Sequence, residues 1–219
     1  MPSINRRAFS QGLLLASAAS ASTLSTVTHA QARAPREGAD YLKLSKPAPI
    51  ETPAGKVEVV EFFWYACPHC NAFEPSFDAW AKRQPAHVVV KRVPVAFRDN
   101  FVPQQQLFYT LEAMGKVEEL HKKVFYAIHV ERQKLDTQAT IVDWAVKQGL
   151  DRNTFSETYR SFGVTSKARK AAQLQDAYQV DGVPSIGIAG RYFTSGSLAQ
   201  TLDRSLQVAD YLIEQARKG

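Results

Sequence analysis

Cys67 and Cys70 are the only cysteines of this 219-residue chain, and only Pro68 and His69 stand between them. Such a pair can serve as a redox-active disulfide, as half of a metal site or as a structural crosslink. Residues three apart in a helix lie close enough to bridge, because disulfides accept a Cα separation of roughly 4.4–6.8 Å. The pair can therefore open and close without movement of the backbone.

The other uses of the pair are disfavoured. A structural disulfide over two intervening residues restrains little chain and would contribute little stability. A zinc site needs two further ligands, and His87, His121 and His129 show no ligand spacing with the pair. Haem attachment needs a histidine directly after the second cysteine, where Asn71 stands. The sequence thus favours thiol–disulfide chemistry without a metal or small cofactor.

The two thiols are predicted to differ. Cys67 is expected where a strand gives way to a helix, near unsatisfied N–H groups and the positive end of the helix dipole, which favour a thiolate. We interpret Cys67 as nucleophile and leaving group and Cys70 as the resolving partner. A protonated His69 would strengthen the oxidant by stabilising the reduced form, although a solvated linker role stays open. Trp64 and Tyr65 are interpreted first as packing groups and second as groove walls.

The elements around the pair form a strand-helix-strand unit. The run "KVEVVEFFW" (56–64) predicts a buried strand, and Pro68 suits the first position of a helix that runs to about Arg83. "HVVVKRVPVAF" (87–97) predicts a second strand parallel to the first. Residues 41–50 are expected to form a short edge strand that Pro47 and Pro49 end.

The middle of the chain is expected to be helical. Residues 103–162 contain amphipathic runs and no convincing strand, with helix stops predicted at Gly115, Gly149 and Gly163. A long helix is expected from about Ser166 to Gln179.

The C-terminal part returns to mixed structure. After a turn at Asp181–Gly182, residues 184–194 predict a hairpin with Ala189–Gly190 as its turn, and a last helix is expected over 198–217. The complete pattern predicts an α/β sandwich interrupted by a helical subdomain.

The N-terminal segment has the layout of a secretory signal peptide. Arg6 and Arg7 precede an apolar run over residues 12–22, and small residues suited to cleavage follow at Ala30 and Ala32. Export through the Sec route and export through the twin-arginine route both fit, since "RRAF" matches the twin-arginine pattern only in part.

The charge of the chain is mildly basic. The net charge is +6, and residues 1–30 hold two arginines and no acid, which leaves +4 on the remainder. Basic residues are scattered among acidic ones over the whole length, so a solvated surface is favoured over nucleic-acid binding.

The motif "EFFWYACPHCNAFEP" (61–75), the late "VDGVPSIGIAGRYF" (180–193) and the helical insert between them resemble the DsbA family of periplasmic thiol:disulfide oxidoreductases. The resemblance covers nearly all of the chain after the leader. It implies a thioredoxin-like fold over residues 31–102 and 164–219, with a helical insertion subdomain over 103–163.

The resemblance also implies roles that spacing alone does not show. Pro184 matches the family's cis-proline beside the disulfide, and Val183 matches the residue whose backbone pairs with an extended substrate. Glu61, Glu74 and Lys91 match the charged residues beneath the cysteines and predict a buried proton-handling cluster. Solvent-reaching side chains at a sheet edge remain the alternative for these three. Pro94 departs from a regular strand and leaves the substrate and partner surface open.

The activity implied by the resemblance is that of a monomeric periplasmic oxidase, which donates the Cys67–Cys70 disulfide to newly exported reduced proteins. A quinone-linked membrane protein of the DsbB type would reoxidise it, and no small cofactor would be needed. A disulfide isomerase or reductase is the nearest alternative. A metal-binding or peptide-holding module is the alternative from another class.

Overall fold

The computed structural model describes residues 33–218. The predicted signal peptide, with cleavage after Ala30 or Ala32, lies outside this part of the chain. None of the helices within residues 33–218 combines the length and the apolar character needed to cross a membrane.

A five-stranded sheet carries the fold, in the order β1-β5-β4-β2-β3. Strands β2 and β3 are parallel, and β4 and β5 form the predicted antiparallel hairpin, with φ of 53° at Ala189 and 64° at Gly190 in its turn. The edge strand β1 is shorter than predicted, because the residues after it bond irregularly to the hairpin turn, as Ala48 N–H does to the Gly190 carbonyl at 2.8 Å. The strands are β1 (Leu42–Lys43), β2 (Val57–Phe63), β3 (Val88–Pro94), β4 (Ser185–Ile188) and β5 (Tyr192–Ser195).

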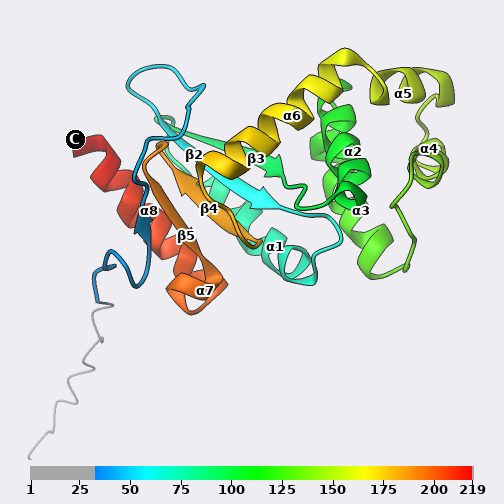
Figure 1. Ribbon diagram of the computed structural model, residues 1–219. Coiled ribbons are helices and arrows are strands. Elements are labelled where there is room, and N and C mark those ends of the chain that lie inside the picture. The colour runs from blue at the N-terminus through cyan, green and yellow to red at the C-terminus, as the bar shows by residue number, and fades with distance from the viewer. Residues whose placement is uncertain (1–32, 219) are drawn as a thin grey trace, which may run out of the picture. The chain divides into compact units, whose positions relative to one another are not determined.

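Helices cover both faces of the sheet, and α2–α5 gather beyond the carboxyl ends of β2 and β3 (Figure 1). We call α2–α5 the insertion subdomain; its outer limits at 103 and 163 stay a prediction. The helices are α1 (Pro68–Lys82), α2 (Val102–Ala113), α3 (Val117–His129), α4 (Gln138–Lys147), α5 (Arg152–Tyr159), α6 (Phe162–Ala177), α7 (Gly196–Ala199) and α8 (Leu202–Lys218), with a 3₁₀ turn over Asp99–Phe101.

Strand β2 lies at the centre of two apolar clusters because its side chains alternate between the faces of the sheet. Val57 and Val59 pack with the apolar residues of α1 and α8. Val60 and Phe62 pack in the other cluster, where the Phe62 ring meets Tyr178 edge-on with centroids 5.3 Å apart. The two clusters hold the strand that leads into the cysteine pair rigidly in place.

Two helix boundaries differ from the prediction. Gly163 lies inside α6 rather than ending a helix, because the Ser161 hydroxyl caps α6 by accepting from the Val164 N–H at 3.2 Å. The last helix is divided into α7 and α8 by Gln200, whose φ is 73°. Gly115 and Gly149, with φ of 66° and 88°, follow α2 and α4 as predicted.

Gly187 of β4 lies directly beneath the ring of Tyr178. A Cβ at this position would stand 2.4 Å from a ring carbon of Tyr178, whose hydroxyl accepts from the Gly190 N–H at 2.9 Å. Gly187→Ala is therefore expected to lower the free energy of unfolding in urea by about 1–3 kcal/mol.

Gly163→Ala is the control for this substitution. Its Cβ would meet nothing closer than Ser161 Oγ at 3.8 Å, and alanine in a helix is favoured over glycine by about 0.5–1 kcal/mol. Equal effects of the two substitutions would contradict the packing of Tyr178 on Gly187.

Candidate active site

The cysteine pair lies at the start of α1, where the sequence placed it. Pro68 occupies the first turn, and Cys67 is the N-cap residue, with its sulfur accepting from the Cys70 N–H at 3.4 Å. Both cysteines are free thiols, and Cys67 is 8% exposed while Cys70 is 1% exposed. A reagent approaching from solvent therefore meets the sulfur of Cys67 first.

The surroundings drive the acidities of the two thiols apart. The hydrogen bond from the Cys70 thiol, with backbone N–H groups of Cys70 and His69, lowers the pKa of Cys67 to about 6 against the burial that opposes it. Burial raises the pKa of Cys70 well above its usual range. His69 is exposed, and both its backbone N–H and its imidazole charge are among the causes that lower the pKa of Cys67.

The loop before β4 faces the reactive sulfur. The Val183–Pro184 peptide bond is cis, and the Cys67 thiol donates to the Val183 carbonyl at 3.5 Å. His69, Val183 and Pro184 line a groove of about 900 Å³ that extends along residues 42–44 and 195–202. Cys67 does not line the groove itself, but its sulfur contacts Val183, which forms part of the groove wall.

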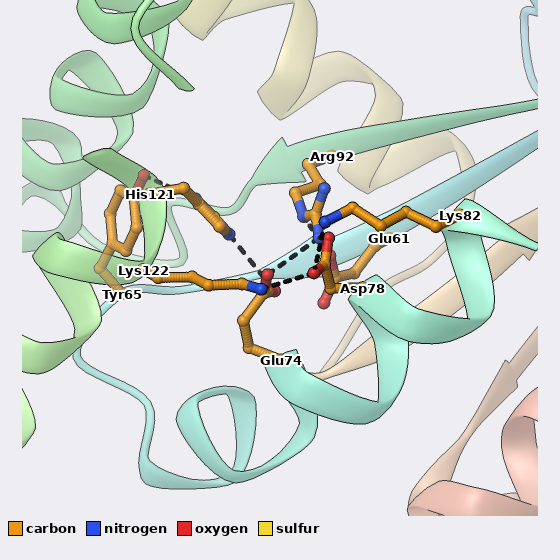
Figure 2. Close-up of polar contacts among 8 residues, drawn as sticks. All are labelled: Glu61, Tyr65, Glu74, Asp78, Lys82, Arg92, His121 and Lys122. Carbon is orange, nitrogen blue, oxygen red and sulfur yellow. Dashed lines mark hydrogen bonds and ion pairs between the residues drawn. The ribbon is translucent and has the colours of Figure 1, made fainter. Parts of the chain in front are cut away.

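A cluster of charged side chains lies under the start of α1, with Glu61 from β2, Glu74 from α1 and Arg92 from β3 (Figure 2). Arg92 Nη2 donates to Glu74 Oε1 at 2.9 Å, and Arg92 Nε lies 3.2 Å from Glu61 Oε2 as an ion pair without hydrogen-bond geometry. Glu61 and Glu74 are 1% and 4% exposed. The single positive charge of Arg92 can balance only one of these two buried carboxyl groups, so the protonated form of the other is favoured.

Lys91 does not belong to this cluster, contrary to the sequence expectation. Its Nζ lies 2.7 Å from Glu58 Oε2 on the other face of the sheet, and the side chain is one-third exposed. In the parallel register of β2 and β3, Arg92 rather than Lys91 is the partner of Glu61. Neighbouring residues of a strand face opposite sides, and the strand pattern did not show which base faces the cysteines.

His121 and Tyr65 extend the cluster, and sequence reasoning missed this role for both. His121 Nε2 lies 3.3 Å from Glu74 Oε2, and the Tyr65 hydroxyl lies 2.9 Å from His121 Nδ1 (Figure 2). Burial lowers the pKa of His121, so the ring is neutral, accepting from Tyr65 and donating to Glu74. The only available signal was a histidine at a buried position of an amphipathic helix.

Glu61 is the carboxyl group most affected by this environment. Burial raises its pKa from 4.5 to about 8, although Arg92 opposes the shift. The folded protein therefore keeps a proton that the unfolded chain loses, so its stability falls as pH rises through this window. Glu61→Gln removes the titration, and its stability relative to the parent protein is expected to rise by at most about 1.4 kcal/mol per pH unit.

The measurement is urea unfolding of the oxidised protein at pH values across that window, since neither cysteine then titrates. Glu112→Gln, at an exposed carboxylate of α2, is the control and is expected to follow the parent curve. If the Glu61→Gln curve also runs parallel to the parent, Glu61 does not hold the proton.

The fold and the paired thiols define a class. A dithiol at the amino end of a helix, one sulfur acidic and reachable and the other buried, performs thiol–disulfide exchange, and the enzyme is a thiol:disulfide oxidoreductase. Residues 33–218 hold no group of three or more His, Cys, Asp or Glu side chains placed to bind a metal ion.

Comparison with known proteins gives the family. Residues 92–207 match the family model of the DSBA-like thioredoxin domain. The chain is 44% identical over 206 residues to the thiol:disulfide interchange protein DsbA of Bordetella pertussis, covering 94% of this chain and 96% of the relative. It is 40% identical over 191 residues to that of Burkholderia cepacia, covering 87% and 90%.

Solved structures of DsbA proteins match the fold of this chain. The crystal structure of Pseudomonas aeruginosa DsbA superposes with a TM-score of 0.79 at 42% identity, covering 83% of this chain and 94% of that one. DsbA of Xylella fastidiosa superposes at 0.80 and 27% identity, covering 85% and 100%. The chain belongs to the DsbA family, and the predicted thioredoxin-like fold with a helical insertion is confirmed.

Proposed function

We propose that this protein oxidises newly exported polypeptides by donating the Cys67–Cys70 disulfide to them. The observation that carries the proposal is the opposite treatment of the two thiols. The Cys67 sulfur accepts hydrogen bonds that stabilise its thiolate, and Cys70 is almost fully buried. Whatever stabilises the dithiol form makes the disulfide a stronger oxidant.

Each reaction cycle moves two electrons to the enzyme. A substrate thiolate attacks Cys67 Sγ, the Cys67–Cys70 bond breaks, and Cys70 leaves with the electron pair and takes up a proton. A second substrate thiolate then attacks the substrate sulfur of the mixed disulfide, and Cys67 leaves as a thiolate. The substrate has lost two thiol protons and gained a disulfide, while the enzyme holds one thiol and one thiolate.

Glu61 supplies the proton that the leaving Cys70 requires. At neutral pH its raised pKa of about 8 keeps the carboxyl group protonated, and once ionised its negative charge raises the pKa of the Cys70 thiol. Arg92 pairs with this carboxyl group and offsets its charge after the proton leaves, whereas the negative charge of Glu74 favours the protonated form of Glu61. Lys91 has no part in this step.

Substrates and partners follow from the site and the family. The open groove beside Cys67 suits extended, reduced polypeptides, whose backbone pairs with Val183 next to Pro184. We place the monomeric protein in the periplasm, with a quinone-linked membrane protein of the DsbB type as the reoxidant. The redox-active disulfide serves in place of a small cofactor.

The test is a reaction of the oxidised protein with a reduced, unfolded protein substrate, together with equilibration against glutathione buffers. An oxidase forms one substrate disulfide, from two thiols, for each Cys67–Cys70 disulfide that it loses. Efficient repair of scrambled disulfides with little net oxidation would instead identify an isomerase. A potential close to that of a cytosolic reductant, roughly −270 mV, would overturn the proposed direction.

A further inference from the structure

The peptide unit that joins Tyr65 to Ala66 lies one residue before Cys67, and side chains of helices α2 and α3 hydrogen-bond to both of its polar groups. Its N–H, from Ala66, donates to Gln104 Oε1 at 3.1 Å. Its carbonyl, from Tyr65, accepts from His129 Nε2 at 2.8 Å. Among the hydrogen bonds of residues 33–218, these two satisfy the polar groups of this peptide. Both partners belong to the insertion subdomain.

Helix α3 holds Tyr65 at three points. His121, Phe125 and His129 are spaced by four residues and therefore lie along one side of the helix. The His121 ring meets the Tyr65 hydroxyl, the Phe125 ring meets the Tyr65 ring edge-on with centroids 5.1 Å apart, and His129 meets the backbone. Tyr65 is 1% exposed, so it has no freedom to leave this contact without disrupting the core.

Gln104 is itself fixed in orientation. The side chain is 5% exposed, and its Nε2 donates to the Leu135 carbonyl at 3.0 Å while its Oε1 accepts from Ala66. Turning the amide over would place an N–H against an N–H and a carbonyl against a carbonyl. Gln104 therefore transmits the position of the insertion subdomain to the residue next to Cys67.

The position of the Cys67 sulfur depends on this peptide. Cys67 is the N-cap of α1 in an extended conformation (φ −79°, ψ 118°), and its sulfur lies 3.4 Å from the Cys70 N–H. Because hydrogen bonds weaken quickly with distance and angle, a small rotation before Cys67 would weaken the contact that stabilises the thiolate. The disulfide form gains less from this contact, so its loss would affect the two redox states unequally.

We propose that Gln104 and His129 are positioning residues of the redox site, and that through them the insertion subdomain sets the oxidising strength of the Cys67–Cys70 disulfide. His121 supports this role by holding the Tyr65 hydroxyl. The inference rests on the proposed function. It adds that the oxidising strength of the disulfide depends in part on residues of the insertion subdomain, outside the thioredoxin-like part of the chain.

The test compares Gln104→Leu and His129→Phe with the parent protein. Phenylalanine keeps the ring that stacks on Phe125, with centroids 6.1 Å apart, and removes only the donor. Each variant is expected to lower the equilibrium constant for oxidation of glutathione by about threefold to fivefold. The double variant is expected to lower it by about tenfold, equivalent to about 30 mV for a two-electron couple. The ultraviolet absorbance of the Cys67 thiolate is expected to appear at higher pH in each variant.

Two further variants separate positioning from general stability. Gln105→Leu removes another buried α2 glutamine, which donates to the Pro94 carbonyl at 2.9 Å and does not reach residues 65–67. It is expected to lower the unfolding free energy in urea while leaving the glutathione equilibrium within about twofold of the parent value. His129→Gln keeps an amide donor near the Tyr65 carbonyl and is expected to restore most of the parent equilibrium.

Two results would overturn the inference. In the first, Gln104→Leu and His129→Phe fold but keep the glutathione equilibrium constant and the thiolate titration of the parent protein. In the second, Gln105→Leu shifts the equilibrium constant and the titration as far as those two variants do. The proposed function fails in a different way. A parent protein that does not oxidise reduced substrates would refute the function, while the thiolate titrations would still decide whether Gln104 and His129 position Cys67.

Discussion

Cys67→Ser is expected to abolish the oxidation of reduced proteins completely while leaving the fold intact. The substitution removes the sulfur that substrates attack, and the remaining Cys70 is only 1% exposed. Serine is among the preferred N-cap residues, and its hydroxyl can accept from the Cys70 N–H as the sulfur does now. The measurements are thiol consumption with a reduced protein substrate and urea unfolding of the variant.

Cys70→Ser is the matched variant. Both proteins carry a single thiol, but treatment with oxidised glutathione is expected to attach glutathione rapidly to Cys67 in Cys70→Ser and slowly to Cys70 in Cys67→Ser. Mass spectrometry over time distinguishes the two. Comparable rates would show that the thiols are equally reachable and reactive, and the assignment of Cys67 as nucleophile would then be wrong.

The reduced protein is expected to become more stable, relative to reduced Cys67→Ser, as pH rises above about 6. The folded-state pKa of Cys67 is lowered from 9.0 to about 6, chiefly by the hydrogen bond with Cys70. Between these values the unfolded chain keeps a proton that the folded protein has lost, so the free energy of unfolding rises with pH. The contribution of the Cys67 thiolate is complete above pH 9 and is lost below pH 6. The slope is at most about 1.4 kcal/mol per pH unit, since solvent near the sulfur screens part of the effect.

Urea unfolding of the two reduced proteins at several pH values measures this difference. Subtracting the Cys67→Ser curve removes the contributions of Glu61 and His121, whose pKa values are also shifted by burial. Parallel curves would mean that Cys67 ionises in the folded protein as it does in the unfolded chain. The thermodynamic basis of the oxidising direction would then be absent.

Most of the redox centre was predictable because its signals are local. A β-branched and aromatic run, a proline at a first helical position and two cysteines three residues apart act over about a dozen residues, and α1 begins where they indicated. The parallel pairing of β2 with β3 and the hairpin turn at Ala189–Gly190 followed from equally short-range rules.

The buried cluster shows where local signals stop. The resemblance to the DsbA family implied Glu61, Glu74 and Lys91 for this cluster, but the structure pairs Arg92, not Lys91, with both carboxyl groups. Two adjacent bases on a strand carry the same sequence signal. Only the register of β2 against β3 and the packing of α1 on one face decide which base is buried.

The amino-acid sequence by itself determined the chemistry of the Cys67–Cys70 pair, its place at a helix start and the helical character of the middle of the chain. Tertiary structure alone decided what surrounds the pair: Arg92 beneath it, His121 against Tyr65, and Gln104 and His129 on the peptide before Cys67. The last three contacts join residues 38 to 64 positions apart. No periodicity or spacing encodes such contacts, because they arise only when separately folded helices pack and their polar side chains meet backbone groups left without partners.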